Sequence, residues 1–307
     1  MGRQTILGAG GIIGKELARI LPEYTSDIRL VSRHPEKVNA GDTLFSADLN
    51  NAEQVAEAVT GSAVVYLTAG LPYRAKTWQQ QWPRILENTI QACKKQGARL
   101  IFFDNIYSYG KTDGAITEQS PYHPSSKKGK VRLALARMLE SAWNKGEIEG
   151  AIVRAADFYG PGAANGVFNM LVADKLKQKK KAQWLCNDLV RYSMTFTPDA
   201  ARGTAMVGNT TGAMNQVWHL PTSAEEMNAA SLIALCAETA GAPSRTMILK
   251  KWMLQLGGLF DPTVRELIEL LYEYQYDYIF DSSKFEKQFD FKATPYREGI
   301  KRTLQDA

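Results

Sequence analysis

Short apolar runs alternate with longer amphipathic stretches through the first half of the chain. The apolar runs are nearly continuous, and they lie at residues 5–7, 28–32, 43–49, 62–70, 99–104 and 150–154. Runs of this kind are typical of parallel strands that are covered on both faces. The stretches between them predict helices from about residue 51, at 79–95 and at 127–145. This alternation predicts an α/β fold with a doubly wound parallel sheet, because strand–helix–strand units cross over with one hand.

The first of these units contains a glycine-rich turn. Residues 5–14 read TILGAGGIIG, and the helix-forming stretch KELARIL follows at once. Glycines permit a tight turn and a close approach of the backbone to phosphate, while the start of a helix offers unpaired N–H groups. The order strand, glycine turn, helix therefore predicts a Rossmann-like dinucleotide site rather than a turn that serves packing alone. The residues predicted to bind the cofactor here are Gly8, Gly10, Gly11, Ile12, Ile13 and Gly14.

The end of the second strand favours a phosphorylated cofactor. It reads Val31–Ser32–Arg33, without the carboxylate that holds a ribose 2′-hydroxyl. Arg33 suits a 2′-phosphate and Ser32 adds a hydroxyl, so we expect NADP, with NAD as the alternative if Arg33 is only a surface charge. Asp48 is expected to accept a hydrogen bond from the adenine amino group. Thr68, Ala69 and Gly70 are expected to pass under the riboses.

The regular alternation ends near Gly160–Pro161–Gly162. Beyond it, residues 224–240 and 262–275 predict helices, and the period of two in the tyrosines of 272–278 suits a strand or an extended segment. We predict a nucleotide-binding domain over residues 1–160. Residues 161–307 are predicted to form a smaller, mixed substrate-binding lobe, with some segments returning to the sheet.

The composition is ordinary for a soluble globular protein. The chain has 307 residues, 45% apolar and 22% charged, with a formal charge of +5. The lysine run KLKQKKK at 175–181 could bind nucleic acid, but no aromatic residues interleave with it, so a solvated helix end is favoured. The three cysteines and three histidines have no spacing typical of disulfides or metal sites. The expected cysteine state is a buried free thiol.

No segment resembles a targeting or membrane-spanning sequence. The first strand begins almost at residue 1, and no apolar stretch approaches the roughly 18 residues that a membrane span needs. We therefore expect a cytoplasmic protein with a small-molecule substrate and with neither a nucleic-acid nor a membrane partner.

Four segments together resemble the short-chain dehydrogenase/reductase superfamily, and within it the extended, NAD-dependent epimerase/dehydratase branch. They are GAGGIIG, Asp48–Leu49, DNIYSYG at 104–110 and VRAADFYGPG at 153–162. The resemblance implies NAD(P) in the N-terminal lobe, and in many members a nucleotide sugar in the C-terminal lobe. A homodimer is a further expectation from the family. The resemblance to the family also extends the expected cofactor site to Leu49, Asp104, Lys128, Ala156 and Phe158.

The catalytic residues usual in that branch are replaced in this chain. The family uses a Ser or Thr, a Tyr, and a Lys four residues after the Tyr. Here Asn105 stands at the Ser position, Lys128 at the Tyr position and Arg132 at the Lys position. The sequence therefore resembles atypical members of the superfamily, in which the triad is incomplete.

The replaced residues allow two interpretations. Lys128 and Arg132 share one helix face, and two close cations lower the pKa of the lysine, so Lys128 could exchange a proton with the substrate. Arg132 would then bind the ribose, and Asn105 would hydrogen-bond the substrate oxygen. Alternatively, both cations only hold the cofactor. The sequence thus predicts an oxidoreductase that acts on a small carbonyl, hydroxyl or nucleotide-sugar-type substrate, or a non-catalytic NADP(H)-binding sensor.

The sequence suggests roles for two further residues. Arg191 could meet an anionic group of the substrate, or it could form a structural ion pair. His219 is expected to be a hydrogen-bonded strand or loop residue rather than a base.

Overall fold

The chain folds into two compact units that interleave along the sequence. The computed structural model describes residues 2–306. The first unit takes the residues up to Ser108, then Lys128–Arg154 and Ala200–Trp218. The second takes Tyr109–Lys127, Ala155–Asp199 and the residues from His219 onward. The predicted division into domains at residue 160 stays a prediction.

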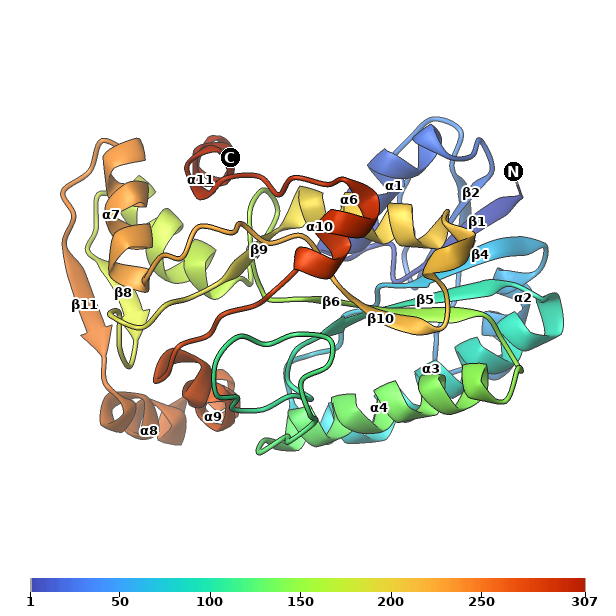
Figure 1. The fold of residues 1–307 in the computed structure, drawn as a ribbon, viewed down its shortest axis with the longest axis horizontal. Helices are drawn as coiled ribbons and strands as arrows, with labels where there is room; N and C mark the ends of the chain where they lie inside the picture. The colour runs from blue at the N-terminus through green and yellow to red at the C-terminus, as the bar shows by residue number, and fades with distance from the viewer. Residues whose placement is uncertain (1, 307) are drawn as a thin grey trace. The chain divides into compact units, whose positions relative to one another are not determined.

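A seven-stranded sheet forms the centre of the first unit (Figure 1). Its order is β10-β6-β5-β4-β1-β2-β3. The strands are β1 (Arg3–Leu7), β2 (Ile28–Ser32), β3 (Thr43–Ser46), β4 (Ser62–Leu67), β5 (Arg99–Asn105), β6 (Gly150–Ala155) and β10 (Gln216–His219). β1 pairs in parallel with both β2 and β4, β2 with β3, and β4 with β5. The predicted doubly wound sheet is confirmed, although β3 and β4 end earlier than the apolar runs suggested.

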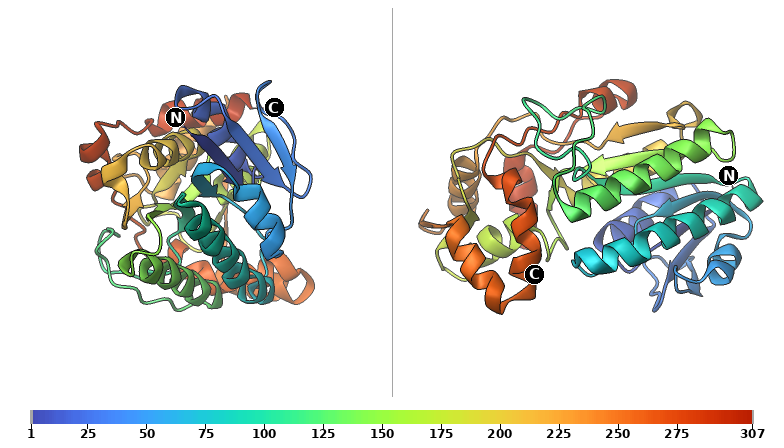
Figure 2. Two further views of the ribbon diagram at one scale, coloured as in Figure 1. Left: turned by 90° about the vertical axis from the view of Figure 1, so that its right-hand side faces the viewer. Right: turned by 90° about the horizontal axis from the view of Figure 1, so that it is seen from below.

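Helices cover both faces of this sheet. They are α1 (Ile12–Ile20), α2 (Ala52–Val59), α3 (Ala75–Gln96), α4 (Lys127–Asn144) and α6 (Thr197–Gly208), and α3 and α4 run along one face (Figures 1 and 2). Successive side chains of β4 point to opposite faces of the sheet, so each face can pack against its own layer of helices. Val65 packs into the core that α2, α3 and α4 complete. Tyr66 points the other way, where a Cβ on Gly208 of α6 would lie 2.4 Å from its hydroxyl.

The second unit contains two small parallel strand pairs. They are β7 (Asp157–Tyr159) with β9 (Met194–Phe196), and β11 (Thr246–Leu249) with β8 (Ala182–Leu185). Its helices are α5 (Asp174–Lys177), α7 (Ala229–Thr239), α8 (Lys251–Phe260), α9 (Pro262–Leu267), α10 (Ser283–Phe289) and α11 (Tyr296–Gln305). A π-helix at Asn169–Ala173 and a 3-10 helix at Ile268–Tyr274 also belong to this unit, whereas short 3-10 helices at Leu21–Glu23 and Thr211–Ala213 belong to the first.

Several predicted boundaries differ from the structure. α7 begins at Ala229 rather than at 224, because the Asn228 side chain accepts a hydrogen bond from the Ser231 N–H and caps the helix there. α9 ends at Leu267, and a 3-10 helix continues to Tyr274. The strand or extended segment expected at 272–278 was wrong for its first half, because Tyr272 and Tyr274 belong to that 3-10 helix.

Two other expectations concern the cysteines and membrane-spanning helices. Cys93 and Cys236 are buried free thiols as expected, whereas Cys186 is half-buried. Within residues 2–306, no helix combines the length and the apolar character needed to cross a bilayer.

Candidate functional site

The turn between β1 and α1 requires two of its glycines for its own shape. Gly8 has φ +95°, and a Cβ there would lie 2.4 Å from the Ala69 Cα. A Cβ on Gly14 would lie 2.7 Å from the Gly8 carbonyl oxygen. The Gly8 and Ala9 N–H groups both donate to the Val31 oxygen, at 2.9 and 3.0 Å. These contacts fix the turn against the ends of β2 and β4.

Gly10, by contrast, is not required by the protein itself. A Cβ on Gly10 would meet nothing closer than Ser32, at 3.9 Å, and its φ is not in the left-handed region. Gly10 and Gly11 are exposed, and Gly11 begins α1 without a side-chain cap. Ile12 and Ile13 therefore start a helix whose first N–H groups face open space, which is the arrangement that binds a phosphate. Buried Ile13 anchors this end of the helix in the core.

The ends of β2 and β4 surround the same turn. The Ser32 hydroxyl is buried and has no hydrogen-bond partner, beside the open space at Gly10. The Thr68 N–H donates to the Leu7 oxygen at 2.9 Å, and Ala69 packs against Gly8. The unpartnered hydroxyl of Ser32 and the exposed glycines therefore lie next to each other at this turn, and both are groups that a phosphate can contact.

Other residues predicted for the nucleotide lie at the carboxyl ends of β2, β3 and β4. Arg33 and Gly70 are exposed, and Leu49 is half-buried against the core. Asp48 is exposed and accepts hydrogen bonds from the Asn50 N–H and side-chain amide, both at 3.0 Å, which lower the pKa of its carboxyl. One carboxylate and one guanidinium are thus both available to solvent here.

Asp104 at the end of β5 is the centre of a buried ion cluster. Its carboxylate lies 3.2 Å from the Arg154 Nε and 3.4 Å from the Arg132 Nη1. All three side chains are buried. Burial lowers the pKa of the Arg132 guanidinium, and Asp104 opposes that shift. Asp104 is therefore held by the protein's own cations, and its role toward a cofactor stays a prediction.

Aromatic rings enclose the two cations of α4, and the sequence reasoning missed them. Arg132 lies 4.6 Å from the ring of Trp78 and 4.2 Å from that of Trp82, while the Lys128 Nζ lies 4.4 Å from the Tyr73 ring. Lys128 is fully buried. The signal that could have found this arrangement is the i, i+4 spacing of Trp78 and Trp82, which places both on one face of α3.

Asn105, the third of the residues predicted to replace the triad, holds the loop after β5. Its side-chain oxygen accepts a hydrogen bond from the Tyr107 N–H at 3.1 Å. This local turn uses the carboxamide oxygen, so the amide nitrogen is the group that remains for a ligand.

Two of the residues predicted for the cofactor belong to the second unit. The Ala156 N–H donates to the Thr195 hydroxyl at 3.0 Å, and Phe158 is half-buried in β7. The structure therefore brings the glycine turn, Ser32, Thr68 and Ala69 together, and it places Ala156 and Phe158 in the other unit.

The second unit also contains a buried cluster of acids and tyrosines. Asp157 accepts hydrogen bonds from the hydroxyls of Tyr192 and Tyr274, the latter at 2.7 Å. Burial raises the pKa of Asp157, and these hydrogen bonds oppose the shift. Glu273 is buried close by, and its pKa is raised by burial and by the charge of Asp157. The pKa of both carboxyl groups is thus raised by their surroundings, and no sequence motif pointed to this cluster.

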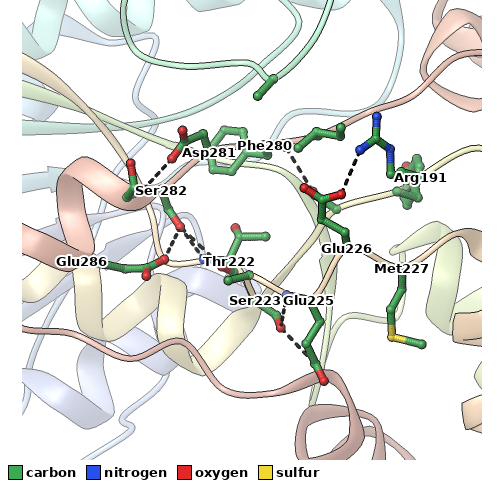
Figure 3. A pocket seen from close by; sticks show the side chains of 16 residues that line it. Arg191, Thr222, Ser223, Glu225, Glu226, Met227, Phe280, Asp281, Ser282 and Glu286 are labelled. Carbon is green, nitrogen blue, oxygen red and sulfur yellow. Dashed lines mark hydrogen bonds and ion pairs between the residues drawn. The ribbon is translucent and has the colours of Figure 1, made fainter.

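A cavity of about 230 Å³ lies in the second unit beside Arg191 (Figure 3). The guanidinium lies 2.8 Å from Glu226 and 2.7 Å from Asp277. Figure 3 shows Glu225, Asp281 and Glu286 around the same cavity. Of the two roles expected for Arg191, the structure shows the structural ion pair.

His219 is hydrogen-bonded on both ring nitrogens, as expected. Nε2 lies 2.8 Å from the Tyr109 hydroxyl, and Nδ1 lies 2.8 Å from the Asp281 carbonyl oxygen. Among residues 2–306, no group of three or more His, Cys, Asp and Glu side chains could hold a metal ion.

Solved structures with the same fold include several sugar-nucleotide enzymes. UDP-glucuronic acid 4-epimerase from Bacillus cereus in complex with NAD has a TM-score of 0.81 and 17% identity, covering 99% of this chain and 97% of its own. UDP-glucose 4-epimerase from Thermus thermophilus, complexed with NAD, has a TM-score of 0.78 and 16% identity, covering 99% and 98%. The dTDP-glucose 4,6-dehydratase DesIV from Streptomyces venezuelae has a TM-score of 0.78 and 16% identity, covering 99% and 96%. At these identities the likeness shows a shared fold.

Sequence comparison adds one curated relative and one family. The uncharacterized protein y4nL of Sinorhizobium fredii is 25% identical over 221 residues, which span 64% of this chain and 61% of that protein. The NAD dependent epimerase/dehydratase family matches residues 5–219, from β1 to the end of β10. That match includes the glycine turn, the ion cluster at Asp104 and both cations of α4. The chain belongs to the NAD dependent epimerase/dehydratase family.

Proposed function

We propose that this chain binds a nicotinamide dinucleotide at the glycine turn and exchanges hydride with a small hydroxyl or carbonyl substrate. The observation that carries the proposal is Gly10, a glycine that neither backbone strain nor packing in the protein requires. Solved structures of the same fold that are named as NAD complexes support the cofactor class. Those neighbours act on nucleotide sugars by name, so a nucleotide-sugar-type substrate is the first class to test.

The proposed cofactor site follows the carboxyl ends of the strands. Gly10, Gly11 and the N–H groups of Ile12 and Ile13 would hold the pyrophosphate, on the turn that Gly8 and Gly14 shape. Ser32, Arg33, Asp48 and Leu49 would hold the adenosine half. Thr68, Ala69 and Gly70 would lie under the riboses. The remaining proposed contacts are those of Asp104, Lys128, Ala156 and Phe158. When bound, the nicotinamide ring supplies or accepts the hydride.

The first experiment is a fluorescence titration of the protein with NADPH and NADH side by side. Tight binding with NADPH preferred supports both the site and the phosphorylated cofactor. Binding of neither would contradict the proposal, because the glycine turn would then serve the fold alone.

Arg33 is proposed to select NADP. Replacing it with Ala should weaken NADPH binding about tenfold or more, because a charge-assisted hydrogen bond to the 2′-phosphate is lost. NADH affinity should change little, since NADH has no group there for Arg33 to bind. Titration of Arg33→Ala with both cofactors checks this, with the exposed neighbour His34→Ala as the control. Equal losses for both cofactors would remove the proposed selection.

Lys128 is proposed to exchange the proton with the substrate oxygen, in place of the family's tyrosine. Arg132 would bind the ribose and tune the local charge, and Asn105 would donate its amide N–H to the substrate oxygen. Lys128→Met keeps the apolar stem beside Tyr73 and removes the ammonium. Turnover should fall at least about a hundredfold, the usual contribution of a positioned acid or base. Cofactor affinity should fall far less than turnover, because Lys128 is only one of many proposed cofactor contacts.

The matched control for this variant is Lys130→Met, which removes an exposed ammonium from the same helix. If Lys128→Met instead abolishes cofactor affinity while residual turnover at saturation is unchanged, Lys128 holds the cofactor and does not exchange the proton. Turnover is measured with a panel of sugar nucleotides and simple carbonyl compounds.

One observation favours a second candidate, a non-catalytic protein that binds NADP(H) and reports redox state. The Arg132 guanidinium lies against the rings of Trp78 and Trp82 and is paired with Asp104. The group that would bind the ribose therefore already interacts with side chains of the protein. This candidate predicts cofactor binding without turnover of any substrate in the panel.

A further inference from the structure

Helix α8 presents an apolar face to solvent. Trp252, Leu256, Leu259 and Phe260 are 61%, 53%, 66% and 87% exposed. At about 100° per residue, their positions fall within an arc of about 100° on one side of the helix. Leu254 and Gly258 lie on the opposite side and are buried. A Cβ on Gly258 would lie 3.2 Å from the Arg265 Cα, so α8 packs on α9 through its inner face. The outer face of α8 is therefore exposed to solvent.

Two segments beside this face carry cations and no acids, although the exposed Asp261 directly follows Phe260. Residues 175–187 and 239–260 contain eight Lys and Arg residues and no Asp or Glu. The eight are Lys175, Lys177, Lys179, Lys180, Lys181, Arg245, Lys250 and Lys251. All except the half-buried Lys175 are exposed. In a chain with 32 acidic residues, two neighbouring segments without any are a distinct surface feature.

The strand pair β8–β11 places these cations in two groups, one at each end of the pair. The Ala182 N–H donates to the Arg245 oxygen at 2.9 Å, which brings the lysine run beside Arg245 at one end of the pair. The Cys186 N–H donates to the Leu249 oxygen at 3.0 Å at the other end, where Lys250 caps α8 and Lys251 is its first residue. Figure 1 shows β11 continuing directly into α8. Met247, between the two groups of cations, is also exposed. We name the outer residues of α8, Met247 and the eight cations the α8 surface.

We propose that the α8 surface docks onto an anionic lipid bilayer. Trp, Leu and Phe side chains on one helix face enter the boundary between headgroups and acyl chains, and flanking Lys and Arg meet the anionic headgroups. The absence of a membrane-spanning stretch, on which the expectation of no membrane partner rested, does not bear on a helix that lies along the surface.

The other occupants fit the observations less well. A two-fold contact between copies of this chain would bring the eight cations of one copy toward the same eight of the other. Nucleic acid would match the charge but would leave Leu256 and Leu259 without a partner, since bases stack on aromatic rings. Of these three occupants, the lipid surface is the one that uses the apolar and the cationic residues at once.

The test is vesicle flotation of the full chain at physiological salt. One set of vesicles is phosphatidylcholine alone, and the other contains about one third phosphatidylglycerol, a fraction that gives a clear negative surface potential. The protein should float with the anionic vesicles and remain in solution with the neutral ones. No flotation with anionic vesicles would overturn the proposal.

Two variants separate the two parts of the surface. Lys179→Glu/Lys180→Glu/Lys181→Glu should reduce partitioning about tenfold or more, because each lost cation weakens binding severalfold. Leu259→Ser/Phe260→Ser should do the same through lost apolar insertion. The controls are Lys292→Glu and Leu44→Ser, which change an exposed cation and an exposed apolar residue elsewhere. Circular dichroism confirms that each variant is folded.

Competing occupants give distinct results. Loss of flotation in the controls as well as in the surface variants would overturn the proposal. So would an oligomer in size-exclusion chromatography that Leu259→Ser/Phe260→Ser dissociates, or single-stranded DNA bound more tightly than anionic vesicles. The α8 surface does not depend on the proposed cofactor, so failure of either proposal leaves the other intact.

Discussion

Replacing Gly10 with Ala will weaken cofactor binding about tenfold to a hundredfold while leaving the folded protein unchanged. The added methyl group meets no protein atom closer than 3.9 Å, so neither the turn nor α1 needs to move. The same methyl group projects into the space proposed for the pyrophosphate. Overpacking of this kind costs about 1–3 kcal/mol, which corresponds to the loss in affinity. Titration with NADPH and a thermal melt of the variant measure both quantities.

Two other glycines serve as controls for this experiment. Gly212→Ala also adds a methyl group in open space, away from the turn, and should change neither affinity nor melting temperature. Gly14→Ala should lower both, because its methyl group would lie 2.7 Å from the Gly8 oxygen and would distort the turn. If Gly10→Ala binds NADPH as tightly as the unmodified protein, the pyrophosphate does not lie against Gly10 and the proposed site is wrong.

Replacing Asp104 with Ala will destabilise the protein by about 3–5 kcal/mol. The substitution leaves the guanidinium groups of Arg132 and Arg154 buried without the carboxylate that lies 3.4 and 3.2 Å from them. Removing one partner of a buried ion cluster has a cost of this size, because the remaining charges stay desolvated. Urea denaturation measures the effect as a lower midpoint.

The matched control is Asp27→Ala in the solvent-exposed pair with Arg3, whose atoms lie 3.0 Å apart. An exposed pair contributes about 0–1 kcal/mol, so this variant should unfold close to the unmodified protein. Equal midpoints for Asp104→Ala and Asp27→Ala would show that the buried guanidinium groups do not depend on Asp104.

Local patterns were sufficient for the sheet and for the first turn. Continuous apolar runs predicted β1, β2, β4, β5 and β6 because a strand covered on both faces needs apolar residues at every position. Element ends were less predictable. The start of α7 depends on the Asn228 cap, and α9 passes into a 3-10 helix at Ile268 without a break in the apolar pattern.

The glycine turn shows what a sequence can and cannot distinguish. In the sequence motif, Gly8, Gly10 and Gly14 cannot be distinguished by role. Their neighbours, such as Ala69 and Ser32, come from other strands of the sheet, so only the folded chain separates the glycines that shape the turn from the one that leaves space for a ligand.

The sequence by itself determined the fold class and the family resemblance, because these depend on residue order along the chain. It also predicts, as a proposal to be tested, that Asn105, Lys128 and Arg132 stand in place of the usual triad. The tertiary structure decided the surroundings of those residues: the rings of Tyr73, Trp78 and Trp82, and the position of Asp104 between two arginines. It also decided that the outer face of α8 meets solvent rather than the core. Such contacts join residues that are far apart in the chain, and the physical chemistry of a buried charge or an exposed apolar face is set by the neighbours that folding supplies.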